Sequence, residues 1–542
     1  MVVSDATTRI VILGGGFGGV YTARHLERML RRRERRRVEI TLVSKENYIV
    51  FQPLLPEVIS GSIDMLHAIS PIRRFAKHTR LVTREVEAID LERRVVRLAP
   101  GHLPRPLELP YDHLVVALGN RLDGSTIPGV AEHAIPFKYL GDALHLRNHV
   151  VGCLEAAATE TDPAERALLL TFVVAGGGFS GVECIAELQD FLRDAVRAYP
   201  TIDARELRLI LLQRDARILP ELRESLARFA HRVLAGRGVD VRLGVGLASL
   251  SARSVTIAHK VGGACETIAA ATCVATVPAG PHPVVAALPI ADHGRVPVSA
   301  ELESARAGVW AVGDCARVQL HDGSASPPTA QHALRQAKTC AANILATMRG
   351  TPRRTFAFTG LGTLASLGRR NAVAEILGLR LKGLPAWLLW RGVYATKFPG
   401  LDGQLRLLVD WVLDAFLPRN ITQLRVTHTE AVAREHFQAG ETVFAAGDYG
   451  DKVYFVVRGE LEALRDGRPI ATLRDGDVFG EVALIAMMAR NATVRAVTAA
   501  DVVSVSRAAF ETLLRHVPGV APAMERIVGA RSGAPRLAAN GH

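Results

Sequence analysis

The chain has 542 residues, a length that predicts three or four domains instead of one compact core. Hydrophobic residues make up 49% of it and charged residues 22%, which excludes an intrinsically disordered chain. The formal net charge of +12 favours an anionic partner such as a membrane surface. No uncharged apolar run reaches the roughly 18 residues of a spanning helix, and the first residues carry no export signal.

The first motif is a glycine loop in the stretch RIVILGGGFGGVYTARHL. An apolar strand precedes the loop, an amphipathic helix follows it, and the glycines fall as GxGxxG at Gly14, Gly16 and Gly19. Such glycines allow a tight turn, close approach of a pyrophosphate and helix–strand packing, and the pyrophosphate then binds at the helix N-terminus. The stretch therefore predicts a dinucleotide-binding unit.

A second loop, TFVVAGGGFSGVECIAEL, repeats this pattern at Gly176, Gly178 and Gly181. Two such units favour one site for a flavin dinucleotide and one for a nicotinamide dinucleotide, although two glycine turns without ligands are the alternative. Further along, VWAVGD supplies Gly313 and Asp314 after an apolar strand. An aspartate at a strand end can accept a hydrogen bond from a flavin's ribityl chain.

The order of these stretches, with YDHLVVALGN between the two loops, resembles the flavoprotein reductases with two dinucleotide-binding domains. In that superfamily the first domain is split by the second. Three further stretches resemble the type II NADH:quinone oxidoreductases: NYIVFQPLLPEV, PPTAQHALRQAKTCAANI, and FTGLGTLASLGRRNAVAEILG followed by LPAWLLWRGVYATKFPG. The resemblance covers about residues 8–420.

This resemblance implies that NADH reduces FAD and that the two electrons then pass to a membrane quinone without proton pumping. Glu183, near the nicotinamide–flavin contact, and Gln331, at the quinone end of the flavin, are the implied catalytic residues. The implied FAD-binding residues are Gly14, Gly16, Phe17, Gly19, Ser44, Lys45, Pro53, Gly119, Gly313, Asp314, Ala330 and Gln331. The implied residues for NADH, with NADPH also expected, are Gly176, Gly178, Gly181, Glu183, Gln213 and Arg214.

Four positions depart from the family pattern. Ser44 stands where an acidic residue commonly holds the FAD ribose, and Gln213 stands where a glutamate is usual. Arg335 replaces a glutamine of the quinone motif, although Gln336 is adjacent, and Gln404 lies near the place of a basic residue. The second departure predicts relaxed selectivity between NADH and NADPH.

Residues 384–416 are predicted to attach the chain to a bilayer surface. Trp387, Trp390 and Tyr394 share one helical face. A second apolar stripe follows, formed by Leu401, Leu405, Leu408, Val412 and Phe416. The alternative for these faces is a protein core or a dimer contact. The family implies peripheral attachment at the cytoplasmic face of a bacterial inner (plasma) membrane, contact with anionic lipid and a homodimer; no nucleic-acid partner is expected.

After about residue 425 the sequence changes to short glycine-punctuated strands, which predict a small β-barrel or jelly roll. The stretch FGEVALIAMMARNATV adds a short helix start that suits a single cyclic phosphate, with an arginine for the phosphate and a glutamate for the ribose 2′-hydroxyl. It resembles the cyclic-nucleotide-binding domains of the catabolite activator protein and of protein-kinase regulatory subunits. The predicted site comprises Gly480, Glu481, Val482, Ala483, Arg490 and Asn491.

Cyclic AMP is the expected ligand, and an unliganded barrel is the alternative. Because the barrel follows the attachment helices closely, movement of its terminal helix, Ala508 to His516, is expected to shift the attachment helices or the quinone entrance. Ala489 departs from the barrel family, in which a proline often precedes the arginine.

The predicted fold is α/β, with two Rossmann-like domains, one inserted in the other, then an amphipathic anchor and the barrel. The predicted divisions are 1–140 and 286–355 for FAD, 141–285 for NAD(P)H, 356–420 for a C-terminal hairpin and the membrane-anchoring helices, 421–530 for the cyclic nucleotide, and 531–542 as a disordered tail. Two rival functions stay open. One is a sulfide:quinone oxidoreductase, which needs flavin-side cysteines such as Cys153 and Cys340. The other is a cyclic-nucleotide receptor on an inactive scaffold. No metal site is predicted.

Overall fold

A computed structural model of the chain describes residues 7–99, 107–122, 126–276, 279–320, 323–358, 360–417, 419–423, 432–448, 450, 452–486, 489–507 and 509–510. The predicted tail 531–542, and all of the predicted terminal helix except residues 509–510, lie outside these ranges.

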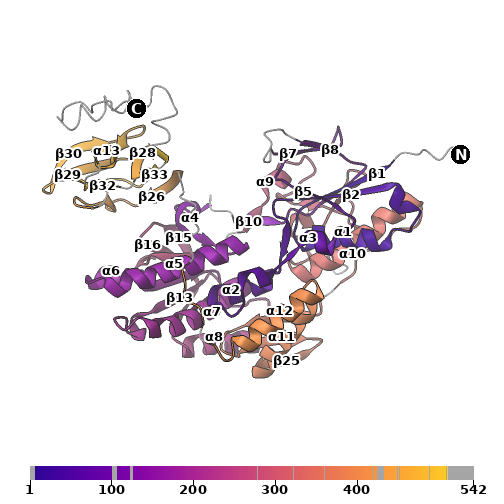
Figure 1. Ribbon diagram of the computed structural model, residues 1–542, viewed down its shortest axis with the longest axis horizontal. Helices are drawn as coiled ribbons and strands as arrows, with labels where there is room; N and C mark the ends of the chain where they lie inside the picture. Colours follow the sequence, from indigo (N-terminus) through magenta and orange to yellow (C-terminus); the bar gives the residue numbers. More distant parts are fainter. Residues whose placement is uncertain are drawn as a thin grey trace, which may run out of the picture.

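The first domain is built on a parallel five-stranded sheet (Figure 1). In spatial order its strands are β21 (Val309–Ala311), β9 (His113–Val116), β1 (Thr8–Leu13), β2 (Val38–Ser44) and β5 (Arg80–Thr83). Strand β1 ends in the buried run Ile10–Leu13, as expected for a sheet covered on both faces. Helices α1 (Phe17–Met29) and α10 (Ala330–Arg349) pack against each other. Strand β21 comes late in the sequence and closes this sheet beside β9, so the chain returns to it after the second domain.

The second domain repeats the same arrangement between β9 and β21. Its parallel sheet runs β11 (Ile135–Pro136), β18 (Thr272–Ala275), β12 (Thr171–Ala175), β13 (Arg208–Gln213) and β14 (Val239–Leu243). The helices are α5 (Leu140–Thr159), α7 (Phe179–Ala195) and α8 (Glu224–Gly236). An antiparallel sheet of β15 (Val245–Leu250), β16 (Ser254–His259) and β17 (Cys265–Ala269) follows.

The region predicted as a hairpin with attachment helices, 356–420, is a small sheet followed by two helices. The sheet comprises β23 (Gly362–Ser366), β24 (Ala372–Ile376) and β25 (Leu379–Gly383), and the helices are α11 (Leu384–Lys397) and α12 (Leu401–Leu413). Within the described ranges, no helix combines the length and apolar character that crossing a bilayer requires.

The aromatic face of α11 is not a membrane surface. Trp390 is only 1% exposed, and Tyr394 packs edge-on against it at 4.7 Å between ring centroids. Tyr394 also contacts Phe51 of the first domain. The alternative reading of this face, a protein core, is therefore correct. Periodicity identified an apolar face but did not identify what covers it.

The stripe on α12 faces outward instead. All five of its predicted members are exposed, from Leu408 at 47% to Leu401 at 83%. The opposite side of α12 is anchored by the buried residues Leu407 and Trp411. Each helix therefore buries one side, and the larger exposed apolar stripe lies on α12, while α11 exposes Leu384 and Leu388.

The C-terminal domain is a barrel of two four-stranded antiparallel sheets. One sheet runs β26 (Val432–Phe437), β33 (Ala500–Ser506), β28 (Lys452–Arg458) and β31 (Val478–Phe479). The other runs β27 (Thr442–Phe444), β32 (Thr493–Ala496), β29 (Leu461–Arg465) and β30 (Arg468–Leu473). The predicted α/β fold with a C-terminal β domain is confirmed.

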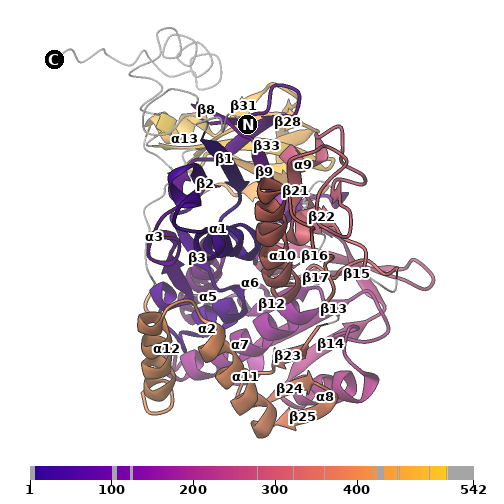
Figure 2. The same cartoon turned by 90° about the vertical axis from the view of Figure 1, so that its right-hand side faces the viewer.

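The barrel lies away from α11 and α12. Figure 2 shows the barrel at the top of the molecule and these two helices at the bottom, and in Figure 1 they are also well separated. Strand β26 instead packs against α4 (Val130–His133), next to the second domain. The expectation that the barrel would act directly on the attachment helices is not supported, because among the described residues no hydrogen bond or ion pair joins the barrel to α11 or α12. The linker residues Asn420 and Gln423 bond to α5 instead.

Candidate functional sites

The two glycine loops have nearly the same backbone. Gly14 and Gly176 adopt φ angles of +114° and +117°, a region that favours glycine. A Cβ on Gly19 would lie 1.9 Å from the Gly14 carbonyl oxygen, and one on Gly181 would lie 1.8 Å from that of Gly176. Only glycine fits these four positions, so both turns are fixed by the sequence.

The middle glycine of each loop faces open space. A Cβ on Gly16 or on Gly178 would meet no atom within 4 Å. Both residues are the N-caps of the helices that follow, α1 and α7, and neither helix receives a side-chain cap. The free N–H groups and the open space fit the pyrophosphate of a dinucleotide at each loop.

The strand-end residues Ser44 and Gln213 occupy equivalent places beside the loops. The Ser44 hydroxyl packs against Gly15, whereas the side-chain amide oxygen of Gln213 accepts a hydrogen bond from the Gly177 N–H at 2.9 Å. The Gln213 amide also donates to Asp215 at 3.2 Å. Sequence reasoning missed Asp215, although an acidic side chain two residues beyond the strand end was visible.

The other predicted dinucleotide residues vary in exposure. Arg214 and Lys45 are exposed just after their strands. Phe17 is buried against Phe51, with 5.8 Å between ring centroids. Pro53, partly buried, lies in the short 3-10 turn Gln52–Leu54.

The turn after β21 contains a carboxylate, Asp314, that accepts no hydrogen bond from the described residues. The Gly313 N–H donates to the Gln336 side chain at 2.7 Å. Among the described residues nothing donates to the adjacent Asp314 carboxylate; burial raises its pKa, against the attraction of Lys138. Gly119, with φ +70°, leaves open space around its Cβ direction. A carboxylate to which no described residue donates, together with open glycines, fits the ribityl chain and pyrophosphate of FAD.

Gln331, predicted at the quinone end of the flavin, lies in the first turn of α10 after Ala330. Its amide donates to the Gly362 carbonyl at 2.8 Å, and its oxygen accepts from the Leu361 N–H at 3.3 Å. Gly362 is the first residue of β23. The start of strand β23 therefore fixes the Gln331 side chain.

Glu183 is held at the other end of the same strand. Its carboxylate accepts from the Ser366 N–H at 2.9 Å and from the Trp390 indole at 3.3 Å. Since Gly362 and Ser366 bound β23, the two contact points lie roughly 13 Å apart at about 3.3 Å per residue. Burial raises the pKa of Glu183 to about 8, so the group is mostly a neutral acid at pH 7.

Two of the residues that depart from the family pattern, Arg335 and Gln404, make defined contacts within the protein. The Arg335 guanidinium lies 4.0 Å from the Phe358 ring centroid and donates to the Gln331 carbonyl at 3.2 Å. Gln336, adjacent in sequence, is buried and committed to the Gly313 turn, so it does not replace the missing glutamine. Gln404 donates to the Phe398 carbonyl at 3.0 Å and ties α12 to the end of α11.

The two cysteines of the sulfide-oxidising alternative do not form a pair. Cys153 lies on α5 of the second domain, Cys340 lies on α10, and both are buried and free. Burial raises the pKa of Cys153 to about 11 and also raises that of Cys340. Neutral, separated thiols do not supply the nucleophilic pair that this chemistry needs.

The barrel holds its predicted ligand groups inside. Arg490 is 4% exposed and donates to the Gly480 and Lys452 carbonyls at 2.7 and 2.8 Å. Its guanidinium lies 4.2 Å from the Phe444 ring centroid. Glu481 is also buried, at the start of α13 (Glu481–Ala486). A cyclic phosphate can replace the two carbonyls as the partner of Arg490.

The remaining predicted cyclic-nucleotide residues differ in exposure. Ala483 is buried and Val482 partly buried in the first turn of α13, whereas Asn491 is exposed. Gly480 has φ +82°, and a Cβ there would lie 2.7 Å from an Arg490 nitrogen. This turn therefore favours glycine for both backbone and space.

Polar contacts join the barrel to the second domain. His133 Nε2 of α4 lies 2.6 Å from the His436 carbonyl oxygen. Glu441 accepts a hydrogen bond from Ser251, at the end of β15. Arg434 lies 3.7 Å from Glu132. The barrel is thus attached to the domain that carries the second glycine loop.

Comparisons with known protein families divide the chain into the same three parts: the two dinucleotide-binding domains, the region of α11 and α12, and the barrel. The pyridine nucleotide-disulphide oxidoreductase family matches residues 8–337, the NDH2 C-terminal domain matches 361–420, and the cyclic nucleotide-binding domain matches 434–517. The type II NADH:quinone oxidoreductase NdhA of Mycobacterium tuberculosis is 32% identical, covering 79% of this chain and 91% of its own. The demethylphylloquinone reductase NdbB of Synechocystis sp. is 30% identical, covering 76% and 96%.

Solved structures share the fold at lower identity. The structure of NDH2 from Plasmodium falciparum in complex with NADH has a TM-score of 0.71 and 19% identity, covering 77% of this chain and 100% of that one. The sulfide:quinone oxidoreductase from Aquifex aeolicus has a TM-score of 0.58 and 17% identity, covering 76% and 96%. The fold is therefore common to more than one chemistry.

Proposed function

Because the chain belongs to the type II NADH:quinone oxidoreductase family, and so transfers electrons from NADH through FAD to a quinone, we propose that it does this at a membrane surface under cyclic-nucleotide control. NADPH is proposed as a second donor. One observation carries the redox part: β23 connects Gln331 to Glu183, and so links the two dinucleotide domains.

The redox proposal is tested by anaerobic addition of NADH to the purified protein. Flavin absorbance should bleach with NADH and return on addition of a quinone. Bleaching that a quinone fails to reverse would exclude quinone as the acceptor. A protein that NADH does not bleach would favour the inactive-scaffold alternative.

The membrane part rests on the apolar stripe of α12. Its five members are exposed, and the basic residues Arg406 and Lys397 are exposed nearby. An apolar helix face with basic neighbours binds at the interface of an anionic bilayer. A homodimer and the cytoplasmic side of a bacterial membrane stay predictions.

Vesicle sedimentation tests this attachment. The triple change Leu405→Glu, Leu408→Glu and Phe416→Glu should release the protein from vesicles containing anionic lipid. Val261→Glu, at an apolar position that is 90% exposed in the second domain, is the matched control. Equal sedimentation of the triple variant and the control would contradict the assignment.

The regulatory part rests on Arg490 and on the barrel's contacts. We infer that cyclic AMP pairs with Arg490, donates its 2′-hydroxyl to Glu481, and acts on the second domain through β26 and α4. The Arg490 contacts to Gly480 and Lys452 are the ones that the phosphate replaces. Allosteric coupling of about 1–3 kcal/mol corresponds to a change of roughly 5- to 150-fold.

Calorimetry with cyclic AMP and cyclic GMP on the protein and on Arg490→Leu tests binding. Kinetics then test the route: cyclic AMP should change the KM for NADH more than the KM for quinone. Glu441→Ala, which removes the contact to Ser251, should bind cyclic AMP but lose that effect. Glu462→Ala removes a barrel ion pair with Arg495 instead and is the matched control. A nucleotide effect that survives in Glu441→Ala would exclude this route.

A further inference from the structure

Helix α7 carries a line of acidic side chains that continues from Glu183. Glu183, Glu187, Asp190 and Asp194 are spaced four, three and four residues apart, which places them on one helical face. The line spans roughly 16 Å at about 1.5 Å per residue. The first three are buried, and Asp194, the last, is partly exposed. The line therefore runs from the redox site to the surface.

Glu57 of α2 (Leu55–Ser60) joins this line from the first domain. It accepts from the Trp411 indole at 2.7 Å and lies 3.4 Å from Arg391. Burial raises the pKa of Glu57, and the nearby charge of Glu187 raises it further. Burial also raises the pKa of Asp190. Acids of this kind can hold a proton near neutral pH and pass it on.

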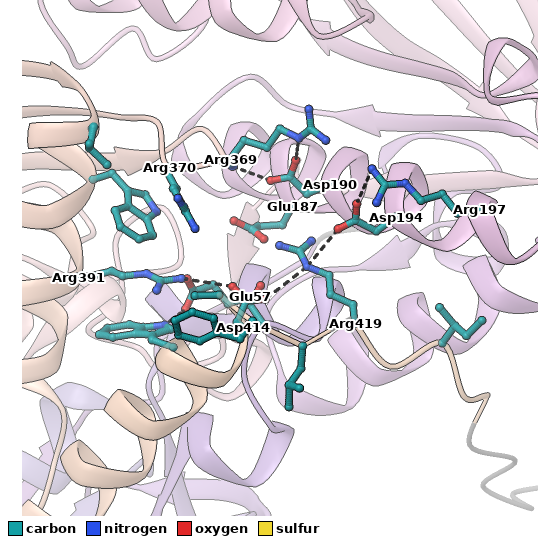
Figure 3. A pocket seen from close by; sticks show the side chains of 18 of the residues that line it. Glu57, Glu187, Asp190, Asp194, Arg197, Arg369, Arg370, Arg391, Asp414 and Arg419 are labelled. Atoms are coloured by element: carbon teal, nitrogen blue, oxygen red, sulfur yellow. Dashed lines mark hydrogen bonds and ion pairs between the residues drawn. The ribbon is translucent and has the colours of Figure 1, made fainter.

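A cavity of about 780 Å³ lies along the part of this line from Glu187 to Asp194 (Figure 3). Its wall includes Glu57, Glu187, Asp190 and Asp194. The volume is large enough for several waters, and the wall supplies the polar partners that they need. Glu187 Oε2 is buried and has no hydrogen-bond partner among the described residues. Such an atom facing a polar cavity is a site for water.

The remaining charged groups around the cavity are largely paired. They are Arg197, Arg237, Arg369, Arg370, Arg391, Arg419 and Asp414. Asp190 pairs with Arg237 and Arg369, and Asp414 pairs with Arg391 and Arg419. Within the described ranges Glu187 forms no ion pair, so it is the acid in this line that is least restrained.

The reaction needs a proton from water. The hydride that leaves NADH carries two electrons and one proton, whereas reduction of a quinone to a quinol takes two electrons and two protons. One further proton is therefore taken up in each turnover. Glu183 is buried, so a proton that reaches it from the surface has to cross buried structure.

We propose that Asp194, Asp190, Glu187 and Glu57, with cavity water between them, carry this proton from the surface to Glu183. The proposal rests on the proposed quinone reduction. Glu187 is the central relay: it takes a proton from cavity water and passes one to Glu183, and a proton from the surface replaces it.

The main test is Glu187→Gln, followed in two half-reactions by stopped flow. Reduction by NADH should be unchanged, while reoxidation by a quinone should slow by about 100-fold, the lower end of what a proton-transfer group contributes. The solvent isotope effect on reoxidation should increase. In Glu187→Ala, added formate should restore part of the rate, because a small acid can enter the cavity. Glu224→Gln, at an exposed carboxylate on α8, is the matched control.

A second readout does not depend on turnover. The infrared band of protonated carboxyl groups should titrate at lower pH in Glu187→Gln, because the charge of Glu187 helps to raise the pKa of Glu183. Glu187→Asp, which keeps an acid in the cavity, should restore at least half of the reoxidation rate. Equal slowing in the Asp and Gln variants, or wild-type reoxidation in Glu187→Gln, would overturn the route. Failure of the unmodified protein to reduce quinone would instead reject the proposed function.

Discussion

Helices α1 and α7 follow the same kind of glycine loop but carry different side chains. Counting from the third glycine, the matching positions hold Tyr21, His25 and Arg28 on α1, and Glu183, Glu187 and Asp190 on α7. The loops superimpose in backbone conformation because glycine is required at the same places. The glycines thus determine that a dinucleotide can bind, and the helix face determines what else that site does.

The largest expected effect is the loss of a ligand, which should be FAD at the first glycine loop and NADH at the second. Gly16→Val should abolish FAD retention, a loss of at least roughly 100-fold in affinity or ~3 kcal/mol. Gly178→Val should keep FAD but prevent its reduction by NADH. In both, the new side chain enters the open space where a pyrophosphate fits. Flavin release on gel filtration and anaerobic bleaching measure the two effects.

Gly19→Val is the control for that pair. Its Cβ would lie 1.9 Å from the Gly14 carbonyl, so this change should lower the melting temperature of the protein itself. If Gly16→Val destabilised the apoprotein as strongly as Gly19→Val, the open position would be structural and not a ligand site.

The second prediction concerns Glu183, whose matching position on α1 is held by Tyr21. The pKa of Glu183 is raised by burial to about 8, so the folded protein holds a proton that the unfolded chain releases near its ordinary value of 4.5. Stability from this group is present below about pH 4.5 and is lost as the pH rises toward 8. In Glu183→Gln the melting temperature should therefore fall less between pH 5 and 8. Parallel curves for the two proteins would show that Glu183 does not titrate in this range.

A smaller effect is expected at the strand end beside the second loop. Gln213→Glu keeps the acceptor for the Gly177 N–H but adds a charge that repels the 2′-phosphate of NADPH. The ratio of kcat/KM for NADH to that for NADPH should rise about tenfold, or ~1.4 kcal/mol. In the unmodified protein that ratio should stay below roughly a thousandfold, or ~4 kcal/mol. No change with Gln213→Glu would mean that Asp215 already sets the selectivity.

The smallest effect is expected at the equivalent position beside the first loop. Ser44→Ala removes one hydroxyl and should weaken FAD binding by only about fivefold, near the ~1 kcal/mol of a single hydrogen bond. Titration of the apoprotein with FAD measures it, and the KM for NADH is the internal control. A comparable change in that KM would show that the two sites are not independent.

Much of the site was accessible from the sequence because its determinants are local. A GxGxxG loop between an apolar strand and a helix fixes its own backbone, whichever domain surrounds it. The same holds for the Gly313–Asp314 turn and for the glycine that precedes Glu481. In each case a few neighbouring residues require one conformation.

Other features were decided only by tertiary packing. The aromatic face of α11 and the leucine stripe of α12 are equally apolar as sequences, yet the first is buried on Phe51 and the second is exposed. Glu57 meets the acids of α7 from more than a hundred residues away, and the barrel contacts α4 instead of the nearby helices. Periodicity and spacing define which face of an element is apolar or charged; the partner of that face depends on how distant segments pack, which local sequence does not encode.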